Sequence, residues 1–225
     1  ILYAQEANIT ELDAIEVSAD VAEPSGTAPS DGYTAEATVT GTKTTTSVVE
    51  TPQSISTVTA DQIEDQNAAN LGEVLRYTAG ARGETFGFEP RTTFLRIRGF
   101  DVATSGLFRD NLKLANPGFA AGYSLEPYGA ERIDVLKGPS SVLYGQAGPG
   151  GLVNYVSKRP TFDTRREVRV EAGTNDLVQG QFDISGAVND SDTLAVRLVG
   201  LVRDSETQVD FVNDDRKYLA PSLTW

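Results

Sequence analysis

The feature that most limits how this chain can fold is the alternation of apolar and polar residues in four segments near its end. The segments are 165–173, 177–188, 193–203 and 217–225. Successive side chains of a β-strand point to opposite faces, so each segment is predicted to be a strand with one apolar and one polar face. Such segments occur both in soluble β-sandwiches and in the barrels of outer membranes.

The polar faces help to separate these two folds. Alternation alone favours a sandwich, whose apolar faces turn inward. However, Arg, Glu and Gln recur on the polar face of consecutive long strands, and this suits a water-filled lumen. Four strands cannot close into a barrel, so any barrel is expected to continue past Trp225.

The composition excludes several kinds of site. The chain contains no His and no Cys, which excludes a Ser-His-Asp or Cys-His catalytic site, His-ligated zinc and disulfides. No pair of carboxylates stands out as an acid/base site, so we expect no enzyme, no metal site and no cofactor. The net charge of −13 argues against nucleic acid as a partner, because binding phosphates requires a basic face.

Residues 1–47 are predicted to form a flexible N-terminal arm. They are poor in large apolar side chains, and such a segment cannot bury enough surface to offset its ordering entropy. One β-prone island, Leu12–Ala19, has the character of a strand that adds to a partner's sheet. Ile1–Ala4 fit the tail of a signal peptide, and the absence of Met is expected for a processed or excised piece.

Residues 48–160 are predicted to fold as an α+β domain. Thr59–Gln62 and Asn70–Glu73 read as helix starts, after a short strand at 54–59. The runs 94–100, 132–136 and 151–156 are β-prone, yet two of them carry Arg or Asp at positions that a strand would bury. These charges fit an edge strand with a wet face, or a small sheet that packs inside polar surroundings.

Part of this domain resembles the plug of TonB-dependent receptors. The resemblance rests on the run 131–145, on its continuation 148–160, and on the shorter runs 51–55 and 95–100. These matches occur in the family's order, and with the strands that follow they cover residues 48–225. The nearest branch is the ferric-siderophore receptors, in particular the ferrichrome-type group.

The resemblance implies both a fold and a function. The fold would be an α+β plug at 48–160, with a small mixed sheet and short helices. The first antiparallel strands of a transmembrane β-barrel of about 22 strands would follow at 161–225, incomplete in this chain. The function would be active uptake of a ferric siderophore across the outer membrane of a Gram-negative bacterium. TonB and its inner-membrane complex would supply the energy by gripping the arm in the periplasm.

The resemblance also implies roles for particular residues. The TonB box would comprise Leu12, Asp13, Ala14, Ile15, Glu16 and Val17. Arg82 and Phe119 match plug positions that contact the ligand, and loop geometry adds Ser105 and Tyr123. Arg98 and Lys137 match basic plug positions that pair with carboxylates on the barrel wall, although arginine is common where Lys137 stands. Ala120 replaces a second aromatic contact, which argues against ferrichrome itself as the ligand.

One alternative from another class stays open. A soluble β-rich module that binds carbohydrate or acts in adhesion would show the same alternation. It would turn the apolar faces of residues 161–225 inward, away from water.

Overall fold

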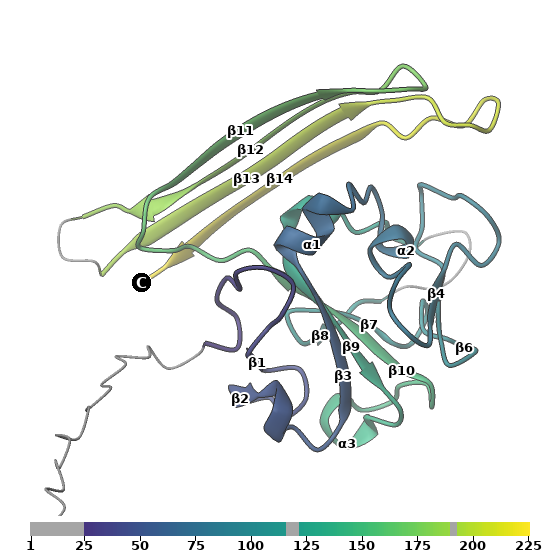
Figure 1. Ribbon diagram of the computed structural model, residues 1–225, viewed down its shortest axis with the longest axis vertical. Helices are drawn as coiled ribbons and strands as arrows, with labels where there is room; N and C mark the ends of the chain where they lie inside the picture. Colours follow the sequence, from purple (N-terminus) through teal and green to yellow (C-terminus); the bar gives the residue numbers. More distant parts are fainter. Residues whose placement is uncertain (1–24, 116–121, 190–192) are drawn as a thin grey trace, which may run out of the picture.

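The computed structural model describes residues 25–115, 122–189 and 193–225. A long, curved sheet of four strands lies across the top of a rounded α+β body (Figure 1). The body is formed by the described residues between 25 and 157, and the four-stranded sheet by those from 165 onward. Within these described ranges, no helix combines the length and apolar character needed to cross a membrane.

The four-stranded sheet is antiparallel throughout, and its strands follow one another in chain order. Its members are β11 (Arg165–Ala172), β12 (Val178–Ala187), β13 (Ala195–Asp204) and β14 (Arg216–Thr224). The ladder between β12 and β13 runs without interruption from Val178 opposite Asp204 to Ala187 opposite Ala195. The four strands predicted from the alternation are therefore confirmed.

The two faces of this sheet are inverted relative to a soluble β-sandwich. The face toward the body buries charged and amide side chains, among them Gln181, Asp183 and Arg197. The outer face exposes a continuous set of large apolar side chains: Val168, Val170, Val178, Ile184, Val196, Leu198, Val202, Leu219 and Leu223. A soluble sandwich would place these two sets the other way round.

The body is built on a five-stranded mixed sheet in the order β3-β9-β10-β7-β8. Its strands are β3 (Ser54–Thr59), β9 (Ala130–Lys137), β10 (Gly151–Ser157), β7 (Leu107–Arg109) and β8 (Leu112–Lys113). The β10–β7 pair is parallel and the others are antiparallel. The apolar core lies against this sheet and is independent of the four-stranded sheet; it includes Val58, Ile63, Leu71, Ile133 and Val153.

Short helices and a second small sheet complete the body. The helices are α1 (Ala60–Asp65), α2 (Leu71–Val74) and α3 (Ser141–Tyr144), with 3-10 turns at Val48–Glu50 and Pro127–Gly129. Both predicted helix starts are confirmed, because Thr59 accepts from the Gln62 amide and Asn70 from the Glu73 amide. The small sheet comprises β4 (Ala81–Gly83), β5 (Leu95–Ile97) and β6 (Phe100–Asp101).

The described part of the expected arm is folded onto the body. Residues 25–47, which we call the docked segment, include the paired strands β1 (Ala37–Thr38) and β2 (Thr46–Ser47). Thr38 and Thr40 are buried, and their hydroxyls donate to Asp134 Oδ2 at 2.7 and 2.5 Å. The expectation of a flexible arm as far as residue 47 is therefore wrong for these residues, because hydrogen bonds to a buried carboxylate replace the apolar burial that the segment lacks.

The charged residues of β9 do not lie on an edge strand. β9 is flanked by β3 and β10, and Glu131, Arg132 and Asp134 are all buried. Asp134 lies 3.5 Å from Arg132 Nε and accepts the docked segment's hydroxyls, whereas Glu131 faces the four-stranded sheet. Of the two explanations for these charges, the sheet inside polar surroundings is therefore the correct one.

Candidate functional site: the seam between the body and the four-stranded sheet

The surfaces of the body and the four-stranded sheet meet along a line of ion pairs, which we call the seam. The body contributes mainly carboxylates and the sheet mainly arginines. Three of the pairs join Glu131 to Arg197, Glu126 to Arg216 and Glu64 to Arg169. The partners are far apart in the sequence, so the pairs exist only once both parts have folded.

The first cluster of the seam is centred on Arg197 of β13. Its Nε and Nη2 donate to the two carboxylate oxygens of Asp183 at 2.8 and 2.7 Å, a bidentate pair across the β12–β13 ladder. Its Nη1 reaches the body, 3.3 Å from Glu131 Oε2 and 2.8 Å from the carbonyl oxygen of Arg159. Lys158 Nζ lies 3.1 Å from Asp183, so each buried charge has an opposite partner.

The second cluster surrounds Glu126, which directly precedes the 3-10 turn Pro127–Gly129. Its Oε2 lies 3.3 Å from Arg216 Nη1 and 3.9 Å from Arg203 Nη2. Asp214, in the loop between β13 and β14, accepts from both arginines at 2.9 and 3.1 Å. Two carboxylates and two arginines thus compensate one another at this end of the seam.

The electrostatics of both clusters are dominated by burial. Burial raises the pKa of Glu126 even though Arg203 and Arg216 lie close to it. Burial likewise raises the pKa of Glu131 against the pull of Arg197, and it lowers the pKa of Lys158. Each group is therefore costly to bury in its charged form, and its opposite partner compensates for part of that cost.

A third set of contacts joins α1 and the turn that follows it to β11, and these contacts are exposed. Arg169 forms an ion pair with Glu64, and Asn67 Nδ2 donates to Glu171 Oε1 at 2.8 Å. Exposed contacts of this kind contribute little to stability. Only Ile63 of α1 is buried in the body. The α1 side of the seam is therefore held more weakly than the two buried clusters.

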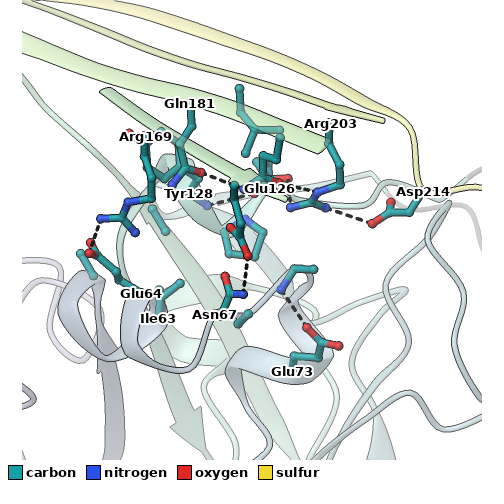
Figure 2. Close-up of a pocket in the computed structure, with 18 of the residues that line it drawn as sticks. Ile63, Glu64, Asn67, Glu73, Glu126, Tyr128, Arg169, Gln181, Arg203 and Asp214 are labelled. Carbon is teal, nitrogen blue, oxygen red and sulfur yellow. Dashed lines mark hydrogen bonds and ion pairs between the residues drawn. The ribbon is translucent and has the colours of Figure 1, made fainter. Parts of the chain in front are cut away.

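A cavity of about 380 Å³ lies between these three sets of contacts. Figure 2 shows Glu64, Asn67 and Glu126 of the body facing Arg169, Gln181 and Arg203 of the sheet across it. Pro29, Ser30 and Asp31 of the docked segment also line it. Among the residues that the structure describes, no group of three or more acidic side chains is placed to hold a metal ion.

The structure describes three of the four residues predicted to contact a ligand. Arg82 on β4 and Tyr123 are exposed, and Ser105 is half-buried in the loop before β7. Phe119 lies outside the described residues, as do the box residues Leu12, Asp13, Ala14, Ile15, Glu16 and Val17. The structure therefore shows three accessible candidates among the residues that it describes.

Near Arg82, a group of aromatic side chains was missed by the sequence reasoning. Phe86 is exposed, meets Phe94 edge-on at 5.1 Å between ring centroids, and lies 6.0 Å from the guanidinium of Arg96. Phe100 of β6 is half exposed. The density of phenylalanines between positions 86 and 100 was the available signal, since exposed aromatic groups on loops mark binding surfaces.

Arg98 and Lys137 do not take part in the seam. Lys137 Nζ donates to Ser56 Oγ at 2.8 Å, and burial, together with the nearby Arg98, lowers the pKa of Lys137. Within the described part of the chain, neither forms an ion pair with a carboxylate. Their pairing with a barrel wall stays a prediction, whereas the seam's actual pairs use acidic groups of the body, which the sequence reasoning did not single out.

Comparison with known proteins identifies the two parts. Residues 47–152 match the TonB-dependent Receptor Plug Domain family. A ferrioxamine receptor of Yersinia enterocolitica is 40% identical over 95% of the chain. The ferrichrome outer membrane transporter/phage receptor of Escherichia coli K12 is 39% identical over 100% of the chain. The chain spans 30% of each of these relatives.

Solved structures agree with this assignment. The ferripyoverdine receptor of the outer membrane of Pseudomonas aeruginosa, bound to ferripyoverdine, superposes with a TM-score of 0.72 at 27% identity. This match covers 81% of the chain and 24% of that protein. The rounded body is therefore the plug, and the four-stranded sheet is the first part of a barrel that is incomplete here. The chain belongs to the family of TonB-dependent receptors.

Proposed function

We propose that this chain is the front part of an outer-membrane receptor that takes up a ferric siderophore actively, with energy delivered through TonB. The matched relatives are named as receptors for ferrioxamine and ferrichrome. The observation that carries the proposal is the inverted sheet, with its apolar face outward and its charged face closed onto the plug. Both faces are energetically favourable only if lipid surrounds the sheet on one side and a polar lumen lies on the other.

The outward side chains support a location in the outer membrane. Val168, Val170 and Leu219 are each more than half exposed, and in water such a large apolar face would drive association. The carbohydrate-binding or adhesion alternative needs these side chains in a core, so it is not favoured. With transport as the activity, the chain has no need of a catalytic centre or a cofactor.

Energy coupling is assigned to the N-terminal arm, which lies in the periplasm in this proposal. The box Leu12–Val17 would add as a strand to the sheet of TonB. In cells producing the complete gene product, deletion of residues 12–19 should abolish uptake of a ferric siderophore labelled with radioactive iron. Binding of the chelate at the cell surface should stay nearly intact. Loss of surface binding in the deletion variant would contradict the coupling role.

Ligand binding is assigned to the plug surface that carries Arg82, Tyr123 and the aromatic group around Phe86, together with Ser105 and Phe119. Arg82→Ala should weaken chelate binding by about 1–3 kcal/mol, as for the loss of a charge-assisted contact. Arg76→Ala is the matched control, because Arg76 is also exposed but pairs with Glu73 and Glu84. Equal affinities of Arg82→Ala and the wild type, measured by titration of the chelate, would remove Arg82 from the site.

A further inference from the structure

Two arginines lie side by side on the outward face of the small sheet β4-β5-β6. On β5, Leu95 and Ile97 are buried in the core of the body, so Arg96 between them points to the opposite face. Arg82 of β4 is its direct cross-strand neighbour, and Ala81 beside it packs against the same core. We call Arg82 and Arg96 the arginine pair.

The positive charges of the arginine pair are not compensated within the described residues. Neither guanidinium group forms an ion pair with a carboxylate there. Asp101 is the neighbour of Arg96 on β6, but it too forms no ion pair with Arg96. The nearby carboxylates bond elsewhere: Glu84 to Arg76, Glu89 to Arg91 and Asp101 to Thr104. Like charges directly opposite each other on two strands destabilise the sheet, and an anion bound between them would remove this repulsion.

Aromatic side chains border the arginine pair. Phe86, on the loop after β4, is 66% exposed, and its ring centroid lies 6.0 Å from the Arg96 guanidinium. Phe94, just before β5, meets Phe86 edge-on at 5.1 Å between ring centroids. A further ring could stack on the exposed part of Phe86, and a guanidinium group favours the face of such a ring. The surface therefore offers positive charge and aromatic contact together.

This surface lies on the side of the plug that a ligand from outside the cell would reach. β4 and β6 lie on the opposite side of the body from β1 and β2 of the docked segment (Figure 1). The loop 84–92 also touches the start of β14, where Arg216 Nη2 donates to the Pro90 carbonyl oxygen at 3.2 Å. In the proposed orientation, with the N-terminal arm in the periplasm, this side faces the cell exterior.

We propose that the arginine pair and Phe86 select the ligand by its charge, and that the preferred ligand is an anionic chelate that carries aryl groups. This deepens the proposed function and rests on it. A guanidinium fork matches two oxygens of an anion, so one anionic group between Arg82 and Arg96 replaces a repulsion by two attractions. Ferric tris-catecholates have both features, because catecholate dianions outweigh the charge of the ferric ion and bring aromatic rings. Hydroxamate monoanions give a neutral ferric complex.

Two synthetic probes separate charge from size. One is the ferric complex of a tripodal ligand with catecholate arms, and the other is the ferric complex of the same tripod with hydroxamate arms. The purified complete gene product is titrated with each. The wild type should bind the catecholate complex at least about tenfold more tightly, as expected for the gain of one charge-assisted contact. Added salt should weaken binding of the catecholate complex and leave that of the hydroxamate complex nearly unchanged.

Substitutions then assign the preference to particular side chains. Arg82→Gln and Arg96→Gln should each lower the affinity for the catecholate complex about tenfold, and change the affinity for the hydroxamate complex less than about threefold. Arg91→Gln is the matched control, because the Arg91 side chain is 81% exposed on the same loop but is paired with Glu89. The comparison of the two probes on the wild type needs no substitution, so it tests the proposal independently of how the variants fold.

Equal or tighter binding of the hydroxamate complex by the wild type would overturn the proposal and leave the receptor function intact. Equal losses for both probes in the arginine variants would also overturn it, because the two arginines would then position the loop without sensing charge. Cells that produce the complete receptor in the outer membrane, yet neither bind nor take up either ferric complex, would contradict the proposed function itself.

Discussion

The extent to which Asp134 stabilises the docked segment can be measured by removing one hydroxyl that donates to it. Thr40 is fully buried; its Oγ1 donates to Asp134 Oδ2 at 2.5 Å and accepts from Asn154 Nδ2 at 2.9 Å. Valine has the same shape as threonine but lacks the hydroxyl. The backbone carbonyl of residue 40 still accepts from the Tyr144 hydroxyl in Thr40→Val.

The size of the effect follows from the two lost bonds. A hydrogen bond to a charged group contributes about 1.5–3 kcal/mol and a neutral one about 0.5–1.5 kcal/mol, so Thr40→Val should destabilise docking by roughly 2–4 kcal/mol. Since 1.4 kcal/mol is a factor of ten, the undocked population should rise about 30- to 700-fold.

Trypsin provides the assay, because Lys43 is the only Lys or Arg before Arg76. Lys43 lies in a tight turn with its amide bonded to the Val39 carbonyl, so cleavage after it requires the segment to undock. When undocking is fast, the rate of cleavage follows the undocked population. Cleavage after Lys43, measured by mass spectrometry on purified receptor, should therefore accelerate by the same factor.

Thr42→Val is the matched control. The Thr42 hydroxyl bonds only within its own turn, 2.9 Å from the Thr44 carbonyl oxygen and 2.7 Å from Thr46 Oγ1. Its loss should change cleavage by less than about threefold, as for an exposed surface substitution. If Thr40→Val is cut no faster than Thr42→Val, the hydrogen bonds to Asp134 do not hold the segment.

Three further tests probe other parts of the structure. Arg197→Ala should lower the thermal stability of the purified receptor by about 3–5 kcal/mol, because it leaves Glu131 buried without its pair; an unchanged melting temperature would refute the buried cluster. Gly83→Ala should destabilise the plug by about 1–3 kcal/mol, since its Cβ would lie 2.2 Å from Gly72 Cα, whereas Gly148→Ala, with no contact under 3.5 Å, should melt like the wild type. Burial raises the pKa of Glu126 above its ordinary 4.5, so its contribution to stability is complete below that pH and is lost as the pH rises through the raised value. Melting curves of Glu126→Gln across this range should lack the step that the wild type shows.

The elements that could be predicted from the sequence are those whose signal is local. The helix start at Thr59 depends on a hydroxyl and an amide three residues apart, and the strand faces of 165–225 depend on alternation alone. Such features are fixed by neighbours in the sequence, so no tertiary information is needed.

The docked segment and the seam could not be predicted because their partners are distant in the sequence. Thr38 and its hydrogen-bond partner Asp134 are 96 residues apart in the sequence. A stretch of threonines has no apolar pattern from which burial could be predicted. Glu131 and Arg197 are 66 residues apart, and in the sequence each looks like a solvated charge. Only the unusual placement of Asp and Arg inside β-prone runs signalled that polar surroundings would cover them.

The seam holds the plug against the four-stranded sheet mainly through charged and amide groups. The apolar core around Ile133 and Val153 is internal to the plug, and the buried seam clusters are formed mainly by charged and amide groups. When such a seam separates in water, Glu126 and Arg216 lose their partner but regain their hydration, so little apolar surface is exposed. An apolar seam of the same area would have to expose that surface to water, at about 25 cal/mol per Å². A seam of carboxylates facing arginines would therefore allow the two parts to separate with little exposure of apolar surface.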